Sequence, residues 1–160
     1  MSEDSTGTMD QRRILVIDSD TWKDLHRWTA AAQAGDGSAA CSLGDLYRLD
    51  IRLPANPRVA FRWYLRGAWA GDPTAMNNLG VCYDEALGCE RDTDRAIHWY
   101  RRAADAGSVE ALDNLGRCYR DGEGVPQDAL RAAELFRMAH AKGDPQAADR
   151  LAEMGLVIEE

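Results

Sequence analysis

A spacing of 36 residues recurs along this chain and limits the folds open to it. Leu-Gly pairs at 43–44, 79–80 and 115–116 keep that spacing, and Leu151-Ala152 continues the series. Other glycines, and a series of aromatic residues, follow the same register: Gly35, Gly71, Gly107, Gly143, Trp28, Tyr64, Tyr100 and Phe136. Periods of this length are typical of repeat proteins, in which one supersecondary unit is copied and stacked.

The pattern inside one unit predicts two α-helices. In the second unit Ala75, Leu79 and Cys82–Tyr83 fall on one stripe of a helix rather than alternating as in a strand. Asp72 can cap this helix, and Pro73 suits its first position. The other helix of the unit ends at a glycine of the register, which adopts a left-handed conformation easily. Its cap residues also recur every 36 residues, as Asp20, Asn56, Asp92 and Asp128.

Units of this kind predict an all-α solenoid, because two helices cannot bury all their apolar surface without stacked neighbours. We expect residues 14–158 to form a single repeat domain, after a disordered tail at 1–13. The domain divides into a half repeat (14–36), full repeats (37–72, 73–108 and 109–144) and a half repeat (145–158). Its first and last helices are lone ones, expected at about 20–34 and from about 145.

Small residues at repeated positions indicate closely packed helices. Glycine inside a helix costs about 1 kcal/mol relative to alanine, so packing must require the glycine of each Leu-Gly pair. Ala75, Ala111 and Ala147 are small for the same reason. The Trp-Tyr pairs at 63–64 and 99–100 recur with the repeat and are predicted to be core, whereas Trp22 and Trp69 are candidates for exposure.

Composition narrows the class of partner. The formal net charge of −8 disfavours nucleic acid and anionic membranes, since both bind through clustered Lys and Arg. The apolar run Ile14–Ile17 is far shorter than a signal-peptide core or a membrane span. Four cysteines are present without a CxxC pair, so a reduced, cytoplasmic protein is expected.

No constellation of residues predicts an enzyme or a metal site. The histidines His26, His98 and His140 form no HxxxH pair, and the first two share a repeat position with Arg62 and Glu134, which indicates a solvated position. Cys82 and Cys118 share another position and are expected to be buried. Cys41 is expected to be more exposed and open to reaction, but no base lies near it in sequence. Catalysis, metal binding and a cofactor are therefore not expected.

The third unit resembles the Sel-1-like repeat proteins, relatives of the tetratricopeptide group. The segments that carry the resemblance are Ala111–Tyr119, Gly122–Asp128, Ala132–Phe136 and Ala139–Gly143, and the likeness extends over residues 17 to about 152. It implies a right-handed α-solenoid that acts as an adaptor or scaffold and docks a protein or peptide along its concave face. The first two units lack the Gly-x-Gly-Val turn of the third, so their turns are open to a different shape.

Residues that face outward and differ between repeats are the candidates for binding, because packing does not dictate them. If the family arrangement holds, the positions beside the core stripe of each first helix line the concave groove. They are Cys41, Asp45, Arg48, Asn77, Val81, Asp84, Asp113, Arg117 and Arg120. The positive pair Arg117 and Arg120 suits a charged or carboxylate-bearing peptide. The alternative for each of these residues is ordinary solvated helix surface.

Two further alternatives stay open at this point. A compact acidic chain is also compatible with a dedicated inhibitor or immunity-type protein that holds one enzyme or toxin inactive. The apolar segments Ile14–Ile17 and Leu156–Ile158 lie at the two ends of the array. They either fold back as caps or form a homodimer through the terminal helices.

Overall fold

The computed structural model describes residues 18–49 and 54–156, which form eight α-helices and no β-strand. They are α1 (Ser19–Gln33), α2 (Gly37–Leu49), α3 (Pro57–Trp69), α4 (Pro73–Asp84), α5 (Thr93–Asp105), α6 (Val109–Asp121), α7 (Ala129–Ala141) and α8 (Ala147–Glu153). The predicted all-α solenoid is confirmed. The tail at 1–13 and the segments Ile14–Ile17, 50–53 and 157–160 lie outside the described residues.

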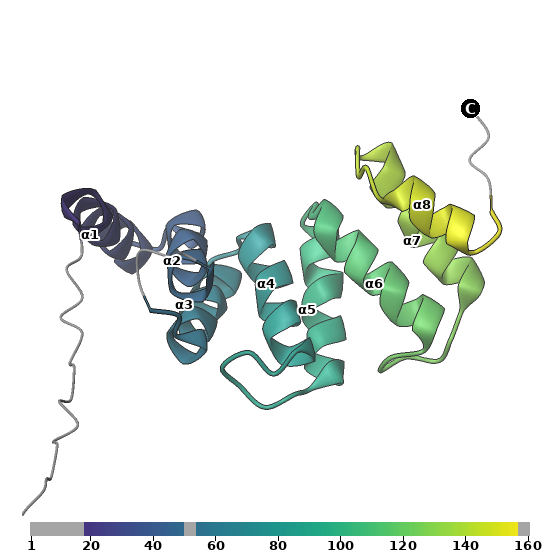
Figure 1. The fold of residues 1–160 in the computed structure, drawn as a ribbon, viewed down its shortest axis with the longest axis horizontal. Coiled ribbons are helices and arrows are strands. Elements are labelled where there is room, and N and C mark those ends of the chain that lie inside the picture. Colours follow the sequence, from purple (N-terminus) through teal and green to yellow (C-terminus); the bar gives the residue numbers. More distant parts are fainter. Residues whose placement is uncertain (1–17, 50–53, 157–160) are drawn as a thin grey trace, which may run out of the picture.

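Consecutive helices pack against one another along the whole array, and Figure 1 shows them stacked in an arc whose two ends bend toward the same side. We call α2, α4, α6 and α8 the A helices and α1, α3, α5 and α7 the B helices. The A helices α2 and α4 also contact each other directly. No described helix is long and apolar enough to cross a lipid bilayer.

Capping residues begin most helices as the sequence predicts. The side chains of Asn56, Asp92 and Asp128 accept hydrogen bonds from backbone amides in the first turns of α3, α5 and α7. Asp72 and Ser108 cap α4 and α6 in the same way. The helices of each full repeat therefore start at equivalent positions.

Two helix starts differ from the prediction. Asp18, not Asp20, caps α1, because its carboxylate also accepts a 2.6 Å hydrogen bond from the Thr21 hydroxyl, and α1 gains two residues over the other B helices. At the other end, Asp144 and Pro145 start a turn, and α8 begins only at Ala147. The same Asp-Pro pair starts α4 directly at Pro73, so the pair alone does not account for the later start of α8.

The glycines of the Leu-Gly pairs lie beneath an aromatic ring of the same repeat. A Cβ atom at Gly80 would lie 2.6 Å from a ring carbon of Tyr100, and one at Gly116 would lie 2.6 Å from Phe136. Gly44 meets Tyr64 in the same way. The A and B helices of a repeat can approach this closely only because these positions lack a side chain.

The turns of the second and third repeats share one shape, although the sequence left a different shape open. Ala86 has a positive φ of 57°, at the position where the third repeat has Gly122 with φ 74°. Gly88 and Gly124 also match. The backbone follows the fold even where alanine stands in place of glycine, at a conformational cost.

Candidate functional site

A ladder of polar contacts joins successive A helices. The amide of Asn114 donates to the Asn77 side-chain oxygen at 2.9 Å, between α4 and α6. Arg150 donates to Asp113 at 3.2 Å, between α6 and α8. Between α2 and α4, the Asn78 amide lies 3.7 Å from the Cys41 sulfur. Each pair is separated by 37 residues, so the same contact recurs once per repeat with an offset of one residue.

The ladder corrects the expected exposure of two candidate residues. Cys41 is 5% exposed and Asn77 is 7% exposed, because the next A helix covers the side of the helix on which they lie. Burial, with the nearby carboxylates of Asp45 and Asp72, raises the pKa of the Cys41 thiol to about 12. The thiol therefore stays protonated at neutral pH, and the expectation of an exposed, reactive Cys41 is wrong.

In the first repeat, the candidate residues Asp45 and Arg48 are tied to a buried tyrosine. The Tyr64 hydroxyl donates to Asp45 at 2.7 Å and accepts from Arg48 Nε at 2.8 Å. Burial raises the pKa of Tyr64, and the Asp45 carboxylate raises it further. Burial alone would lower the pKa of Arg48, but its contacts with Tyr64 and Asp45 outweigh that effect and raise it. These charges are satisfied within the chain.

In the second repeat, the candidate residues carry little free charge. Val81 is half-buried and packs against the main core. Asp84 is also half-buried and lies 3.6 Å from the Arg91 guanidinium, which in addition donates to the Asp84 backbone carbonyl at 2.9 Å. Its carboxylate is therefore partly neutralised by the turn that follows α4.

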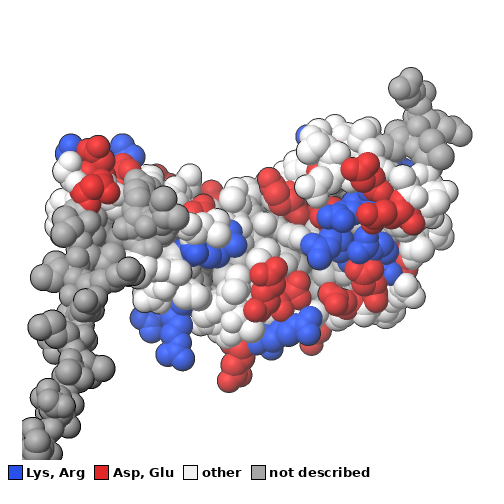
Figure 2. Space-filling model, in the orientation of Figure 1, with Lys and Arg blue, Asp and Glu red and all other residues white. Residues whose placement is uncertain are grey.

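The third repeat presents its candidate arginines at the surface. Arg117 is exposed and makes no ion pair or hydrogen bond within the described residues. Arg120 lies beside it, 2.8 Å from Asp121 and 3.2 Å from Glu153 of α8, and the hydrogen bonds to Asp121 raise the pKa of Arg120. Figure 2 shows basic side chains gathered over α6 and α8 with acidic ones around them. Of the nine candidate residues, Arg117 offers the least engaged charge.

Several residues of this surface were missed by sequence reasoning. Asn78, Asn114 and Arg150 complete the ladder, and Glu153 pairs with Arg120. A search for polar residues 37 apart, rather than 36, would have found the ladder. The role of Tyr64 in binding Asp45 and Arg48 also went unnoticed, because its position indicated only core packing.

The histidine position and two of the cysteines lie in the described part of the chain as the repeat pattern predicts. No group of three or more His, Cys, Asp or Glu side chains there is arranged to hold a metal ion. His26, Arg62, His98 and Glu134 are all exposed, as predicted for their shared repeat position. Cys82 and Cys118 are buried, also as predicted, and burial raises the pKa of these thiols to about 12 and about 11.

The far end of the array is partly closed by its own chain. Leu156 packs against the C-terminal cluster that contains Phe136 and Leu151. The rest of the two predicted apolar end segments, Ile14–Ile17 and 157–158, lies outside the described residues. The homodimer therefore stays a prediction, which light scattering can test.

Comparison with known proteins follows the same 36-residue register. A family profile described as Sel1 repeat matches residues 37–72, 73–108 and 109–144. No curated protein matches the chain.

Solved structures with the same fold include three bacterial proteins. A Sel1 repeat protein from Oxalobacter formigenes has 27% sequence identity and a TM-score of 0.76, over 84% of this chain and 55% of that one. The protein c5321, a protective antigen of uropathogenic Escherichia coli with an SLR fold, has 31% identity and a TM-score of 0.76, over 84% of this chain and 30% of that one. Cysteine-rich protein B of Helicobacter pylori has 19% identity and a TM-score of 0.66, over 82% of this chain and 95% of that one. The chain thus spans about half of the first of these proteins and under a third of the second.

Proposed function

Since this chain belongs to the Sel1 repeat family, whose members are generally protein-interaction modules, we propose that it binds a segment of another protein on the inner face of its third repeat. The observation that carries the proposal is the exposed Arg117, which makes no hydrogen bond or ion pair to another described residue. Arg120 lies beside it but shares its charge with Asp121 and Glu153. Arg117 is therefore the anchor we propose, and Arg120 supports it.

The arrangement favours a carboxylate-bearing segment as the ligand. A guanidinium offers several fixed donors, and an oxygen pair can accept two of them at once. Asp113 and Arg150, which pair across α6 and α8, border this surface. A carboxylate bound at Arg117 would form a new ion pair beside the Asp113–Arg150 pair without displacing an existing one. This mode of binding supports the proposal of an adaptor or scaffold role.

Affinity capture from native lysate with quantitative mass spectrometry tests the proposal on the full chain. We compare wild type with Arg117→Glu, using Arg137→Glu as the matched control, because Arg137 is an exposed arginine on α7 of the same repeat. The expected result is a partner retained by wild type and Arg137→Glu and reduced about tenfold or more by Arg117→Glu, a loss typical of one central contact. Equal recovery with all three proteins would exclude Arg117 as the anchor.

Arg120→Glu is a poorer test of the same surface. It would place a carboxylate beside Asp121 and Glu153, so lost binding could result from a disturbed α6–α8 contact. Circular dichroism of each variant must therefore match wild type before the capture results are compared.

A further inference from the structure

Helix α3 carries a stripe of arginines that the fold does not require. Arg58, Arg62 and Arg66 are spaced by four residues and exposed, and no acidic residue occurs in α3. Residues four apart lie on one face of a helix. At the same three repeat positions α5 has Asp94, His98 and Arg102, and α7 has Leu130, Glu134 and Met138. Because the other B helices form without it, the stripe is a property of α3 alone.

Two of these arginines keep their charge available. Arg66 donates to the carbonyls of Ala32 and Gln33 at the end of α1, at 2.9 and 3.2 Å. Arg58 and Arg62 make no hydrogen bond or ion pair to any other described residue. In a chain with a net charge of −8, such a local excess of positive charge favours an acidic ligand over a basic one.

An apolar recess lies beside the stripe on the same helix. It has a volume of about 640 Å³, and its lining residues are Val59, Arg62, Trp63, Leu65, Arg66 and Trp69. We call these six residues the α3 flank. Trp69 is 70% exposed, the highest value of any described tryptophan. A large aromatic surface next to arginines is the composition typical of protein-binding hot spots.

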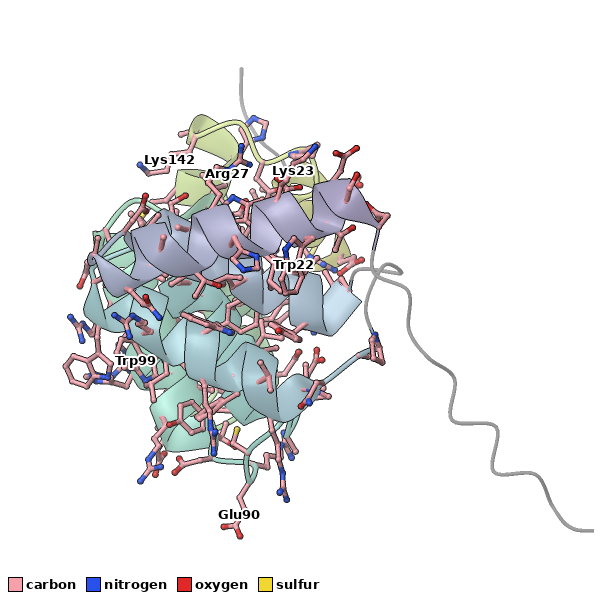
Figure 3. The ribbon with its side chains drawn as sticks, turned by 90° about the vertical axis from the view of Figure 1, so that its left-hand side faces the viewer. Trp22, Lys23, Arg27, Glu90, Trp99 and Lys142 are labelled. Carbon is pink, nitrogen blue, oxygen red and sulfur yellow. The ribbon has the colours of Figure 1, made fainter. Side chains whose placement is uncertain are left out.

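The Trp69 ring is held in place before any ligand arrives. It meets the ring of the buried Trp99 edge to face, with 5.6 Å between centroids. The Arg102 guanidinium lies 5.8 Å from the Trp69 ring and 4.9 Å from the Trp99 ring. Figure 3 shows Trp99 on one flank of the array, away from Trp22 of α1. A side chain already ordered in this way loses little entropy when it is covered.

We propose that the α3 flank docks an acidic amphipathic helix of a partner protein. Its apolar side chains enter the recess beside Trp69, and its carboxylates, spaced by one turn or about 6 Å, meet Arg58 and Arg62. This surface lies on a B helix and shares no residue with the inner face of the third repeat. It can therefore bind independently of the ligand proposed for Arg117.

Nuclear magnetic resonance on the uniformly ¹⁵N-labelled full chain tests this proposal. The Trp69 indole N–H signal is assigned as the one that Trp69→Phe removes. The probe is a synthetic amphipathic helix of about four turns, with Glu on one face and Leu and Phe on the other. A peptide with Lys in place of every Glu is its matched control. Arg62→Glu is compared with Arg137→Glu, which makes the same charge change on α7.

We expect the acidic peptide, and not the lysine peptide, to shift the Trp69 indole signal. Arg62→Glu should weaken that binding about tenfold or more, equivalent to about 1.4 kcal/mol, while Arg137→Glu and Arg117→Glu leave it within about twofold. An unmoved Trp69 signal, equal shifts with both peptides, or equal effects of Arg62→Glu and Arg137→Glu would overturn the proposal. A Trp69 signal that shifts with protein concentration alone would also overturn it, because it would indicate that a second copy of this chain covers Trp69. Tighter binding of an oligonucleotide than of the acidic peptide would overturn it as well.

Discussion

The first and third repeats build the same part of the inner face from different side chains. In the first, the Tyr64 ring lies over a glycine, and its hydroxyl holds Asp45 and Arg48. In the third, Phe136 lies over Gly116 in the same way but has no hydroxyl. One oxygen atom in the core therefore decides whether the polar residues above it have a hydrogen-bond partner in the core.

The difference shows how a repeat protein can keep its fold and change its surface. Arg117 and Arg120 occupy the positions of Asp45 and Arg48, but Phe136 offers them no hydroxyl group to bind. Arg117 faces solvent, and Arg120 turns to the acidic residues of its own and the next A helix. A charge that the core does not use is available for a ligand.

The largest expected effect comes from removing what the two repeats share. Gly44→Ala and Gly116→Ala each place a methyl group against the ring of Tyr64 or Phe136. Overpacking of this kind should lower the free energy of unfolding by about 2–3 kcal/mol in urea titrations. The control is Ala152→Gly, at the exposed fourth position of the series, with a change of at most about 1 kcal/mol. Wild-type stability of either glycine variant would mean that no ring lies over that glycine.

A smaller effect is expected from making the first repeat resemble the third. Tyr64→Phe removes the hydroxyl between Asp45 and Arg48, both half-buried, and should cost about 1–2 kcal/mol of unfolding free energy. Tyr119→Phe is the matched control, because its hydroxyl accepts only an exposed hydrogen bond from Arg101 at 3.0 Å. If both variants lose the same free energy of unfolding, the hydrogen bonds of Tyr64 to Asp45 and Arg48 contribute no more to stability than an exposed hydrogen bond does.

The second repeat offers a gain in stability instead of a loss. Ala86 adopts the left-handed conformation that Gly122 adopts in the third repeat. Ala86→Gly should raise the free energy of unfolding by about 0.5–1 kcal/mol, since relief of strain exceeds the added entropy of the unfolded chain. Gly122→Ala should have the opposite sign. Urea titration measures both, and a destabilised Ala86→Gly would show that the two turns are not equivalent.

The smallest effect concerns the acidic residue that holds Arg120. The Arg120 guanidinium lowers the pKa of Asp121, so this carboxylate stabilises the fold above its unfolded pKa of about 3.9 and loses that contribution as the pH falls through its lower folded pKa. The pair is partly exposed, so Asp121→Asn should cost only about 0.3 kcal/mol at neutral pH. Urea titrations should show the difference shrinking as the pH falls from neutral through the lowered folded pKa of Asp121. A difference that grows on acidification would contradict this origin.

Much of the fold could be predicted from the sequence because each helix carries its own local signals. Caps such as Asp92, the end glycine Gly107 and the stripe through Leu79 depend only on neighbours in the chain. Because the pattern recurs every 36 residues, the same prediction applies to the equivalent positions of the other repeats. Even Asp18 follows this logic, since the choice between it and Asp20 depends on the Thr21 hydroxyl.

The binding surface was harder to predict because it depends on contacts between repeats. Cys41 and Asn77 look exposed on an isolated helix, and only the offset of the next A helix buries them. The stripe on α3 was missed for another reason. The repeat register relates Arg62 to the histidines at its own position, whereas the stripe runs along one helix through Arg58 and Arg66.

The most direct test of the contrast between repeats is hydrogen exchange of the arginine Nε–H groups in the free protein at neutral pH. Arg48 donates this group to Tyr64 in a half-buried site, whereas Arg117 is exposed. We predict that the Arg48 Nε–H exchanges slowly and that Tyr64→Phe abolishes this protection. The Arg117 Nε–H should exchange as fast as that of free arginine. Equal protection of the two arginines would contradict the account.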